Sequence, residues 1–285
     1  MTNRYAHREE PISEKRSTND YSEFREMCQL YTKRTNIVSE GDSWFAYPPK
    51  WIIVGKSSNI ISFLKKKEEF NFYEMARNGD EIVDILSGDS KFDILRAVSE
   101  NKVDFLLISG GANDLVGAYD FEFILQKNDS GQKPEDFIRK DRFDRKISQI
   151  YNAYANLVDY CADYSDNPNI KIITHSYGYA IPQNKPAKFI GGLIVDGPWM
   201  HPTLVALEIP QSVWRQLVVV LIDRLKDAFE NLQKSSSGRF HYIDSTSLIT
   251  DDDWIDEMHL TPAGFKRVAE LMHQKIKELR SPRSP

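Results

Sequence analysis

Residues 36–44 read NIVSEGDSW, and this stretch decides the fold. Its first part, residues 36–39, is a short apolar run bounded by polar positions, as buried strands of parallel sheets are. Gly41 permits a tight turn from the strand into a helix, and the turn lifts the Ser43 side chain above the sheet edge. Amide groups at the start of that helix would stabilise negative charge beside Ser43. The stretch therefore predicts a strand, a turn and an exposed hydroxyl in direct succession.

The rest of the chain repeats this alternation of strands and helices. Further strand-like runs lie at residues 70–75, 103–109, 170–174 and 240–243, and amphipathic helical patterns lie at 21–32, 51–67, 91–101, 142–163 and 212–233. A last helix begins at Thr261-Pro262, an N-cap followed by proline at the first helical position. The alternation predicts an α/β fold: a three-layer α/β/α sandwich around a mostly parallel five-stranded sheet. Right-handed crossovers would bring the carboxyl ends of the strands to one edge, where such sheets bind ligands.

The chain of 285 residues is long enough for one large domain with insertions. We expect a polar N-terminal arm and a helix over residues 1–33, one domain over 34–280 and a disordered tail over 281–285. The stretches at about 117–140 and 180–210 are long for connecting loops, and we expect them to be insertions. The second contains the apolar run FIGGLIVDGPWM, residues 189–200.

Composition and charge exclude several classes of protein. The net charge of -5 argues against a nucleic-acid partner, because phosphate binding needs a concentrated basic face. The N-terminus lacks an apolar run typical of a signal peptide, and no stretch approaches the ~20 apolar residues of a membrane span. We therefore expect a soluble, cytoplasmic protein. Two cysteines, Cys28 and Cys161, are too few for a disulfide framework or a metal cluster, and we expect both to pack as apolar side chains.

The tripeptide Gly-Asp-Ser around Ser43 is by itself a weak signal, because the chain contains it twice. The second copy, residues 88–90, follows an amphipathic segment and precedes the start of a helix. It is typical of a turn in which Asp89 or Ser90 caps the helix. Serine catalysis also requires a base and donors for the oxyanion, so the first copy depends on its partners elsewhere in the chain.

Those partners appear in order along the chain. Gly-Asp-Ser at 41–43 is followed by Gly79 in Arg-Asn-Gly-Asp, by Gly-Ala-Asn-Asp at 111–114 and by Asp-Glu-Met-His at 256–259. This set resembles the four sequence blocks of the SGNH, or GDSL, hydrolase family, although Trp44 replaces the family's usual leucine. The resemblance extends from Ile37 to about Leu279. It implies the flavodoxin-like sandwich of that family.

The resemblance also implies site residues. Ser43 would be the nucleophile, with Asp256 and His259 as its charge and proton partners. The oxyanion would be held by the backbone N–H groups of Ser43 and Gly79 and by the Asn113 side chain. The residues themselves agree, because a spacing of three lets the Asp256 carboxylate accept from one ring nitrogen of His259 while the other faces Ser43. No metal or organic cofactor is implied.

The predicted activity is hydrolysis of a carboxylic ester through an acyl-enzyme. The substrate would be a small-molecule or lipid ester, either a lipid or lysophospholipid acyl ester or a carbohydrate O-acetyl group. Acyl transfer would use the same residues. A non-catalytic binding protein on the same fold stays an alternative, as does a metal-dependent phosphoesterase that uses the acidic run at 251–253 with Asp256 and His259. The sequence does not indicate an oligomeric state.

Four residues are candidates for substrate binding. Trp44, Phe45 and Tyr47 directly follow the nucleophile and would either line the pocket or pack beneath it. His175 follows the fourth predicted strand, at the same edge of the sheet, and would contact substrate or have a structural role.

Overall fold

The computed structural model describes residues 14–48 and 58–280, in which one parallel sheet has the strand order β1-β3-β2-β4-β5-β8. The strands are β1 (Ser17–Thr18), β2 (Thr35–Gly41), β3 (Phe70–Glu74), β4 (Phe105–Ser109), β5 (Lys171–His175) and β8 (Phe240–Ile243). The chain builds β3 on one side of β2 and then β4, β5 and β8 on the other. The order therefore reverses at β2, and open α/β sheets bind their ligands at such a point.

The predicted α/β fold is confirmed, and all five expected strands are present. The sheet has a sixth strand, β1, within the segment that we expected to be a loose arm. It pairs with β3 through Ser17 and Thr18. A two-residue strand at a sheet edge has no apolar alternation, because backbone pairing alone makes it. The sequence pattern therefore does not reveal it.

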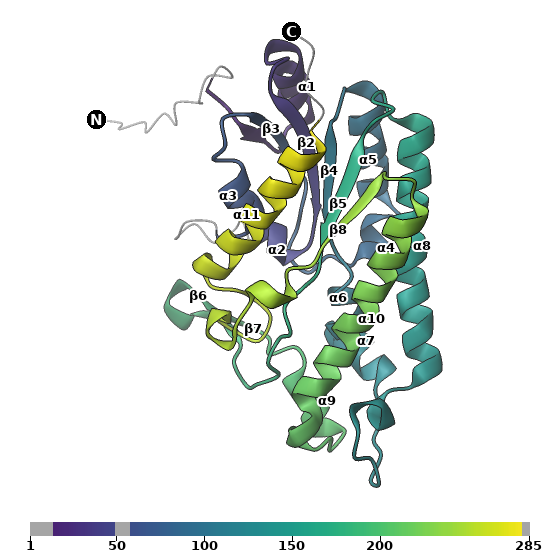
Figure 1. Ribbon diagram of the computed structural model, residues 1–285. Helices are drawn as coiled ribbons and strands as arrows, with labels where there is room; N and C mark the ends of the chain where they lie inside the picture. The colour runs from purple at the N-terminus through teal and green to yellow at the C-terminus, as the bar shows by residue number, and fades with distance from the viewer. Residues whose placement is uncertain (1–13, 49–57, 281–285) are drawn as a thin grey trace, which may run out of the picture.

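Helices cover both faces of the sheet (Figure 1). On one face lie α5 (Asp89–Glu100), α8 (Lys140–Tyr164) and α10 (Trp214–Ser235), and on the other lie α3 (Ile60–Leu64) and α11 (Pro262–Leu279). Short helices follow several strands: α2 (Ser43–Ala46), α4 (Ile82–Ile85) and α6 (Asn113–Val116). Helix α1 (Tyr21–Leu30) precedes β2. Part of the helix expected at 51–67 lies outside the described residues.

The face helices pack on the sheet as their apolar spacing predicts. In α10, Leu217, Leu221 and Leu225 lie on one stripe, and each is at most 1% exposed. Burying one such leucine contributes about 2 kcal/mol. Cys161 of α8 is buried in the same core, and Cys28 of α1 packs against the core while partly exposed.

The two long stretches add structure outside the sheet. The first contains α7 (Ala118–Ile124) and a 3-10 turn, η1 (Pro134–Phe137). The second contains a hairpin of β6 (Ala187–Phe189) with β7 (Ile194–Asp196), followed by α9 (His201–Ala206). Both lie at the lower end of the molecule in Figure 1, the end at which β2 finishes and α2 begins. Within the described ranges, no helix combines the length and apolarity that crossing a bilayer requires.

The second Gly-Asp-Ser copy begins helix α5, as expected, but its capping differs from the prediction. Gly88 is the N-cap, and no side chain caps this end of the helix. Asp89 is already the first helical residue, so neither Asp89 nor Ser90 has the predicted capping role.

Gly41 of β2 is paired with Ser109 of β4 and leaves no room between them for a side chain. A Cβ atom on Gly41 would lie 2.3 Å from the carbonyl oxygen of Ser109, and the φ angle of Gly41 is +150°. The Asp42 N–H donates to that same carbonyl at 2.9 Å. Only glycine therefore allows the chain to turn into α2 while β2 stays paired with β4.

We predict that Gly41→Ala lowers the free energy of unfolding by about 3 kcal/mol, because the new methyl group meets backbone rather than a flexible side chain. The matched control is Gly88→Ala in the second Gly-Asp-Ser copy, where a Cβ atom meets nothing within 4 Å. This control should cost about 1 kcal/mol or less. Urea unfolding of both variants measures the difference, and equal costs would contradict the role given to the close approach.

Candidate active site

Ser43 lies at the carboxyl end of β2, as the first residue of α2. Asp42 is the N-cap of this helix, and its Oδ1 accepts the Trp44 N–H at 3.0 Å. The capped turn holds Ser43 at the rim of the sheet, where it is 8% exposed. As the first residue of α2, Ser43 has no acceptor within the helix for its N–H group.

His259 and Asp256 lie in a closed loop between β8 and α11. An antiparallel bridge between Trp254 and Leu260 joins the two ends of the loop, and the Ile255 N–H donates to the His259 carbonyl at 3.0 Å. Asp256 accepts the His259 backbone N–H at 2.8 Å. Its carboxylate also lies 2.9 and 3.0 Å from His259 Nδ1. The orientation of the imidazole is therefore fixed by hydrogen bonds to both the backbone and the ring of His259.

The structure brings the loop against the turn at Ser43. His259 Nε2 lies 2.9 Å from Ser43 Oγ, across 216 positions of sequence. With Nδ1 donating to Asp256, Nε2 is the acceptor and Ser43 the donor. The three-residue spacing of Asp256 and His259 was the basis of the sequence prediction. In the structure it corresponds to successive hydrogen-bond distances from the Asp256 carboxylate to the His259 imidazole and from the imidazole to the Ser43 hydroxyl.

Tyr47 covers the imidazole. Its ring stacks on that of His259 with centroids 4.1 Å apart, and its hydroxyl lies 3.5 Å from Asp256 Oδ2. Burial and the nearby Asp256 carboxylate raise the pKa of Tyr47 above its usual range, so the hydroxyl stays protonated. Tyr47 therefore contacts both residues of the loop.

The two other candidate oxyanion donors come from the loops after β3 and β4. Gly79 has a φ angle of +85°, in the left-handed region that glycine favours. Its loop lies against the Ser43 turn, because the Arg77 N–H donates to the Gly41 carbonyl at 2.9 Å. Asn113 begins α6, and its Nδ2 donates to the Asp80 carbonyl at 3.0 Å. Asn113 therefore binds the loop that carries Gly79.

Asp114 strengthens this link between the two loops. It is fully buried and accepts the N–H groups of Ile82 at 2.8 Å and Val83 at 3.2 Å, at the start of α4. Burial raises the pKa of Asp114 to about 6 even though these N–H groups oppose the shift. Asp114 thus fixes the segment that directly follows Gly79.

A buried polar cluster lies beneath Ser43. Asp42 accepts from the Ser109 hydroxyl at 2.6 Å and from the Tyr177 hydroxyl at 2.5 Å. His175 Nε2 lies 3.0 Å from Ser109 Oγ, and His175 Nδ1 donates to the Ser176 carbonyl at 2.7 Å. Burial lowers the pKa of His175, which favours a neutral ring. The cluster joins β4 and β5 to the residue before Ser43.

His175 therefore does not lie where a substrate could reach it. It is fully buried and stacks on Trp44, with ring centroids 5.4 Å apart. His175 is the last residue of β5, but its side chain packs among the buried residues beneath Ser43, such as Trp44, instead of reaching the surface at the edge of the sheet. Of its two predicted roles, the structure favours the structural one.

Trp44 and Phe45 also pack beneath the rim. They are 3% and 2% exposed, and the Trp44 indole N–H donates to the Met258 carbonyl at 3.2 Å. Trp44 thus ties the turn at Ser43 to the His259 loop from below. Tyr47 is the member of this group that lies directly on His259.

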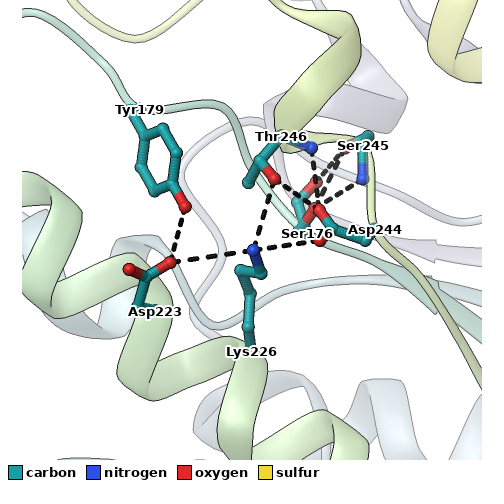
Figure 2. Close-up of polar contacts among 7 residues, drawn as sticks. All are labelled: Ser176, Tyr179, Asp223, Lys226, Asp244, Ser245 and Thr246. Carbon is teal, nitrogen blue, oxygen red and sulfur yellow. Dashed lines mark hydrogen bonds and ion pairs between the residues drawn. The ribbon is translucent and has the colours of Figure 1, made fainter.

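A second polar cluster continues from the Ser176 carbonyl to helix α10 (Figure 2). Lys226 donates to Asp244 at 2.9 Å and to Thr246 at 3.3 Å, and Tyr179 donates to Asp223 at 2.6 Å. Burial opposes the charge on Lys226, but the hydrogen bond and the charge of Asp244, together with Tyr179 and Tyr242, outweigh it and raise the pKa of Lys226 above the usual range. This cluster fixes the carboxyl ends of β5 and β8 against α10.

Two residues of the acidic run at 251–253 are engaged in ion pairs. Asp251 lies 2.6 Å from an Arg215 nitrogen, and Asp253 pairs with Arg267 and accepts from Thr250. Over residues 14–48 and 58–280, no three histidine, cysteine or acidic side chains gather in a way that could hold a metal ion.

Sequence reasoning missed Ser109 and Tyr177, which bind Asp42, and it missed Glu257 between Asp256 and His259. Ser109 ends a strand and Tyr177 follows one, as do the predicted residues, but no spacing rule links them to Asp42. Glu257 was visible only as the variable position of the Asp-x-x-His block.

Comparison with known proteins identifies the fold. No protein-family model matches the sequence, and no curated protein matches it. A lipase from a goat rumen metagenome is 14% identical, with a TM-score of 0.56 over 84% of this chain and 96% of that one. A carbohydrate acetylesterase from Sinorhizobium meliloti is 14% identical, with a TM-score of 0.53 over 87% of this chain and 100% of that one. A protein from Parabacteroides merdae described as a GDSL-like lipase is 13% identical, with a TM-score of 0.53 over 87% of this chain and 97% of that one. The chain thus has the SGNH/GDSL fold.

We predict that Tyr177→Phe lowers the free energy of unfolding by about 2 kcal/mol, because it leaves an oxygen of the buried Asp42 carboxylate without its donor. The control is Tyr179→Phe, which removes a hydroxyl that donates to the half-exposed Asp223 (Figure 2). Water can replace that donor, so the control should cost less than about 1 kcal/mol. Thermal and urea unfolding give both values, and a larger cost for Tyr179→Phe would refute the assignment.

Proposed function

We propose that this protein is a serine hydrolase of the SGNH type that cleaves carboxylic esters through an acyl-enzyme. The observation that carries the proposal is the line from Asp256 through His259 to Ser43, with 2.9 Å between His259 Nε2 and Ser43 Oγ. A serine hydroxyl in that position has a base to take its proton, and the base has a carboxylate to orient it.

The reaction follows from these positions. His259 Nε2 takes the Ser43 proton while Ser43 Oγ attacks the ester carbonyl. Asp256 stabilises the imidazolium that forms. His259 then returns the proton to the alcohol oxygen as the C–O bond breaks, leaving an acyl group on Ser43. Water, deprotonated by His259, attacks this acyl group, and the acid leaves as Ser43 recovers its proton.

Three donors would hold the oxyanion: the N–H groups of Ser43 and Gly79 and the side-chain amide of Asn113. The contacts among their loops support this assignment. The Gly79 loop is hydrogen-bonded to the backbone of Gly41, and Asn113 is hydrogen-bonded to Asp80. Donors fixed in this way need no reorganisation when negative charge develops on the carbonyl oxygen.

The substrate that we propose is a lipid acyl ester or an O-acetyl group on a carbohydrate. The fold is shared with a lipase and with a carbohydrate acetylesterase, so the comparisons favour ester cleavage and leave both kinds of ester open. Phe189 of β6, which lies beside Tyr47, favours an acyl group larger than acetyl.

We predict that Ser43→Ala abolishes labelling by a fluorophosphonate and lowers kcat on p-nitrophenyl esters by at least about 1,000-fold. Ser90→Ala, in the second Gly-Asp-Ser copy, is the matched control and should retain wild-type labelling and rate. Labelling that persists in Ser43→Ala would remove this residue from the mechanism. Loss of wild-type activity in EDTA would favour the metal-dependent alternative.

We predict that Asn113→Ala lowers kcat by about 100-fold with little change in KM, because the amide acts on the transition state more than on the bound ester. Asn113→Asp keeps the shape of the side chain but has no N–H group, so it should lose at least as much. Steady-state kinetics on p-nitrophenyl acetate test both variants. A fully active Asn113→Asp enzyme would show that this side chain does not hold the oxyanion.

A further inference from the structure

Glu257, between Asp256 and His259, is a buried carboxylate that the proposed mechanism does not use. Its side chain is 0% exposed. It accepts four backbone N–H groups from the segment 180–210: Gln183 at 3.1 Å, Trp199 at 2.5 Å, Met200 at 2.8 Å and His201 at 2.9 Å. A single side chain of the triad loop thus binds this segment at two places in its sequence.

The backbone adds to this attachment. The Glu257 N–H donates to the Lys185 carbonyl at 3.0 Å, and Lys185 Nζ donates to the Trp254 carbonyl at 2.9 Å. Burial raises the pKa of Glu257, and the four N–H groups oppose that shift by stabilising the carboxylate. Such a buried acceptor is costly to remove, because its donors would be left without partners.

The attachment places an aromatic side chain against the catalytic imidazole. Trp199 meets His259 edge to face, with ring centroids 5.4 Å apart. The indole also lies against Gly197, where a Cβ atom would come within 2.8 Å of Trp199 Cε3. The backbone N–H of Trp199 is itself one of the groups bound by Glu257. The position of this indole therefore depends directly on Glu257.

The same segment places a second aromatic side chain next to the site. Phe189 of β6 lies 5.8 Å from Tyr47, ring centroid to centroid, and Tyr47 stacks on His259. Phe189 and Trp199 thus place two aromatic side chains of the same segment beside Tyr47 and His259. A hydrocarbon chain is long enough to bury area against these rings, whereas an acetyl group offers a single methyl group.

We propose that Glu257 is a positioning residue that holds segment 180–210 on the triad loop, and that Trp199, held in this way, sets a preference for esters with long acyl chains. The inference rests on the proposed function, since it assigns a substrate class to the same site. Its chemistry is apolar contact along the acyl chain, with the ester carbonyl at Ser43.

The first experiment compares p-nitrophenyl acetate with p-nitrophenyl octanoate. In Glu257→Gln and in Trp199→Ala, kcat/KM for the octanoate should fall about tenfold, mainly through KM, while the acetate changes less than about threefold. Trp199→Phe keeps an aromatic ring and should restore most of the preference. Glu270→Gln makes the same chemical change on the exposed face of α11 and should behave as wild type. Equal losses on both esters, or an unchanged ratio, would overturn the proposal.

The second experiment does not depend on catalysis. Hydrogen exchange at residues 199–201 should be at least about tenfold faster in Glu257→Gln than in wild type, because glutamine cannot accept all four N–H groups. Unchanged exchange would refute the positioning role even in an enzyme that hydrolyses esters. If the wild type neither labels with fluorophosphonate nor hydrolyses either ester, the proposed function fails, and faster exchange in Glu257→Gln would still support the attachment.

Discussion

The close approach of β2 to β4 at Gly41 is the constraint on which the rest of the site depends. Because a methyl group there would collide with the Ser109 carbonyl, the backbone can turn at this point only with glycine. The turn brings the Asp42 N–H onto that carbonyl and the Ser109 hydroxyl onto the Asp42 carboxylate. Ser43 follows at the point where the strand order reverses, so sheet topology and turn chemistry act on the same residue.

The His259 loop must be positioned by other contacts, because its residues come from the C-terminal part of the chain. Trp254 and Leu260 close it by backbone pairing, and Trp44 joins it to the Ser43 turn through the Met258 carbonyl. The contact between Ser43 and His259 is thus supported from below by packing and from the side by backbone hydrogen bonds. A site built in this way keeps its geometry without a bound ligand.

Sequence reasoning was most successful where one residue type has one physical use. Apolar runs predicted the five strands, and the glycine after the first predicted the turn. The sequence did not predict β1 at residues 17–18, because this strand is made by backbone pairing that leaves no apolar pattern. It did not find the contacts of Asp42 with Ser109 and Tyr177, because burial beneath the rim is a property of the folded sheet.

One arrangement occurs beside Ser43, Asn113 and Asp256: a buried carboxylate lies next in sequence to the residue that we assign to the chemistry. Asp42 precedes Ser43 and caps its helix, and Asp114 follows Asn113 and binds the start of α4. Glu257, beside Asp256, binds segment 180–210. Each accepts backbone N–H groups, so each fixes a loop rather than neutralising a charge. Burying carboxylates costs free energy, and at this rim the cost is offset by N–H groups that would otherwise lack partners. The result is an edge of the sheet whose loops are held in place by the protein itself, as the proposed electrostatic stabilisation of a transition state requires.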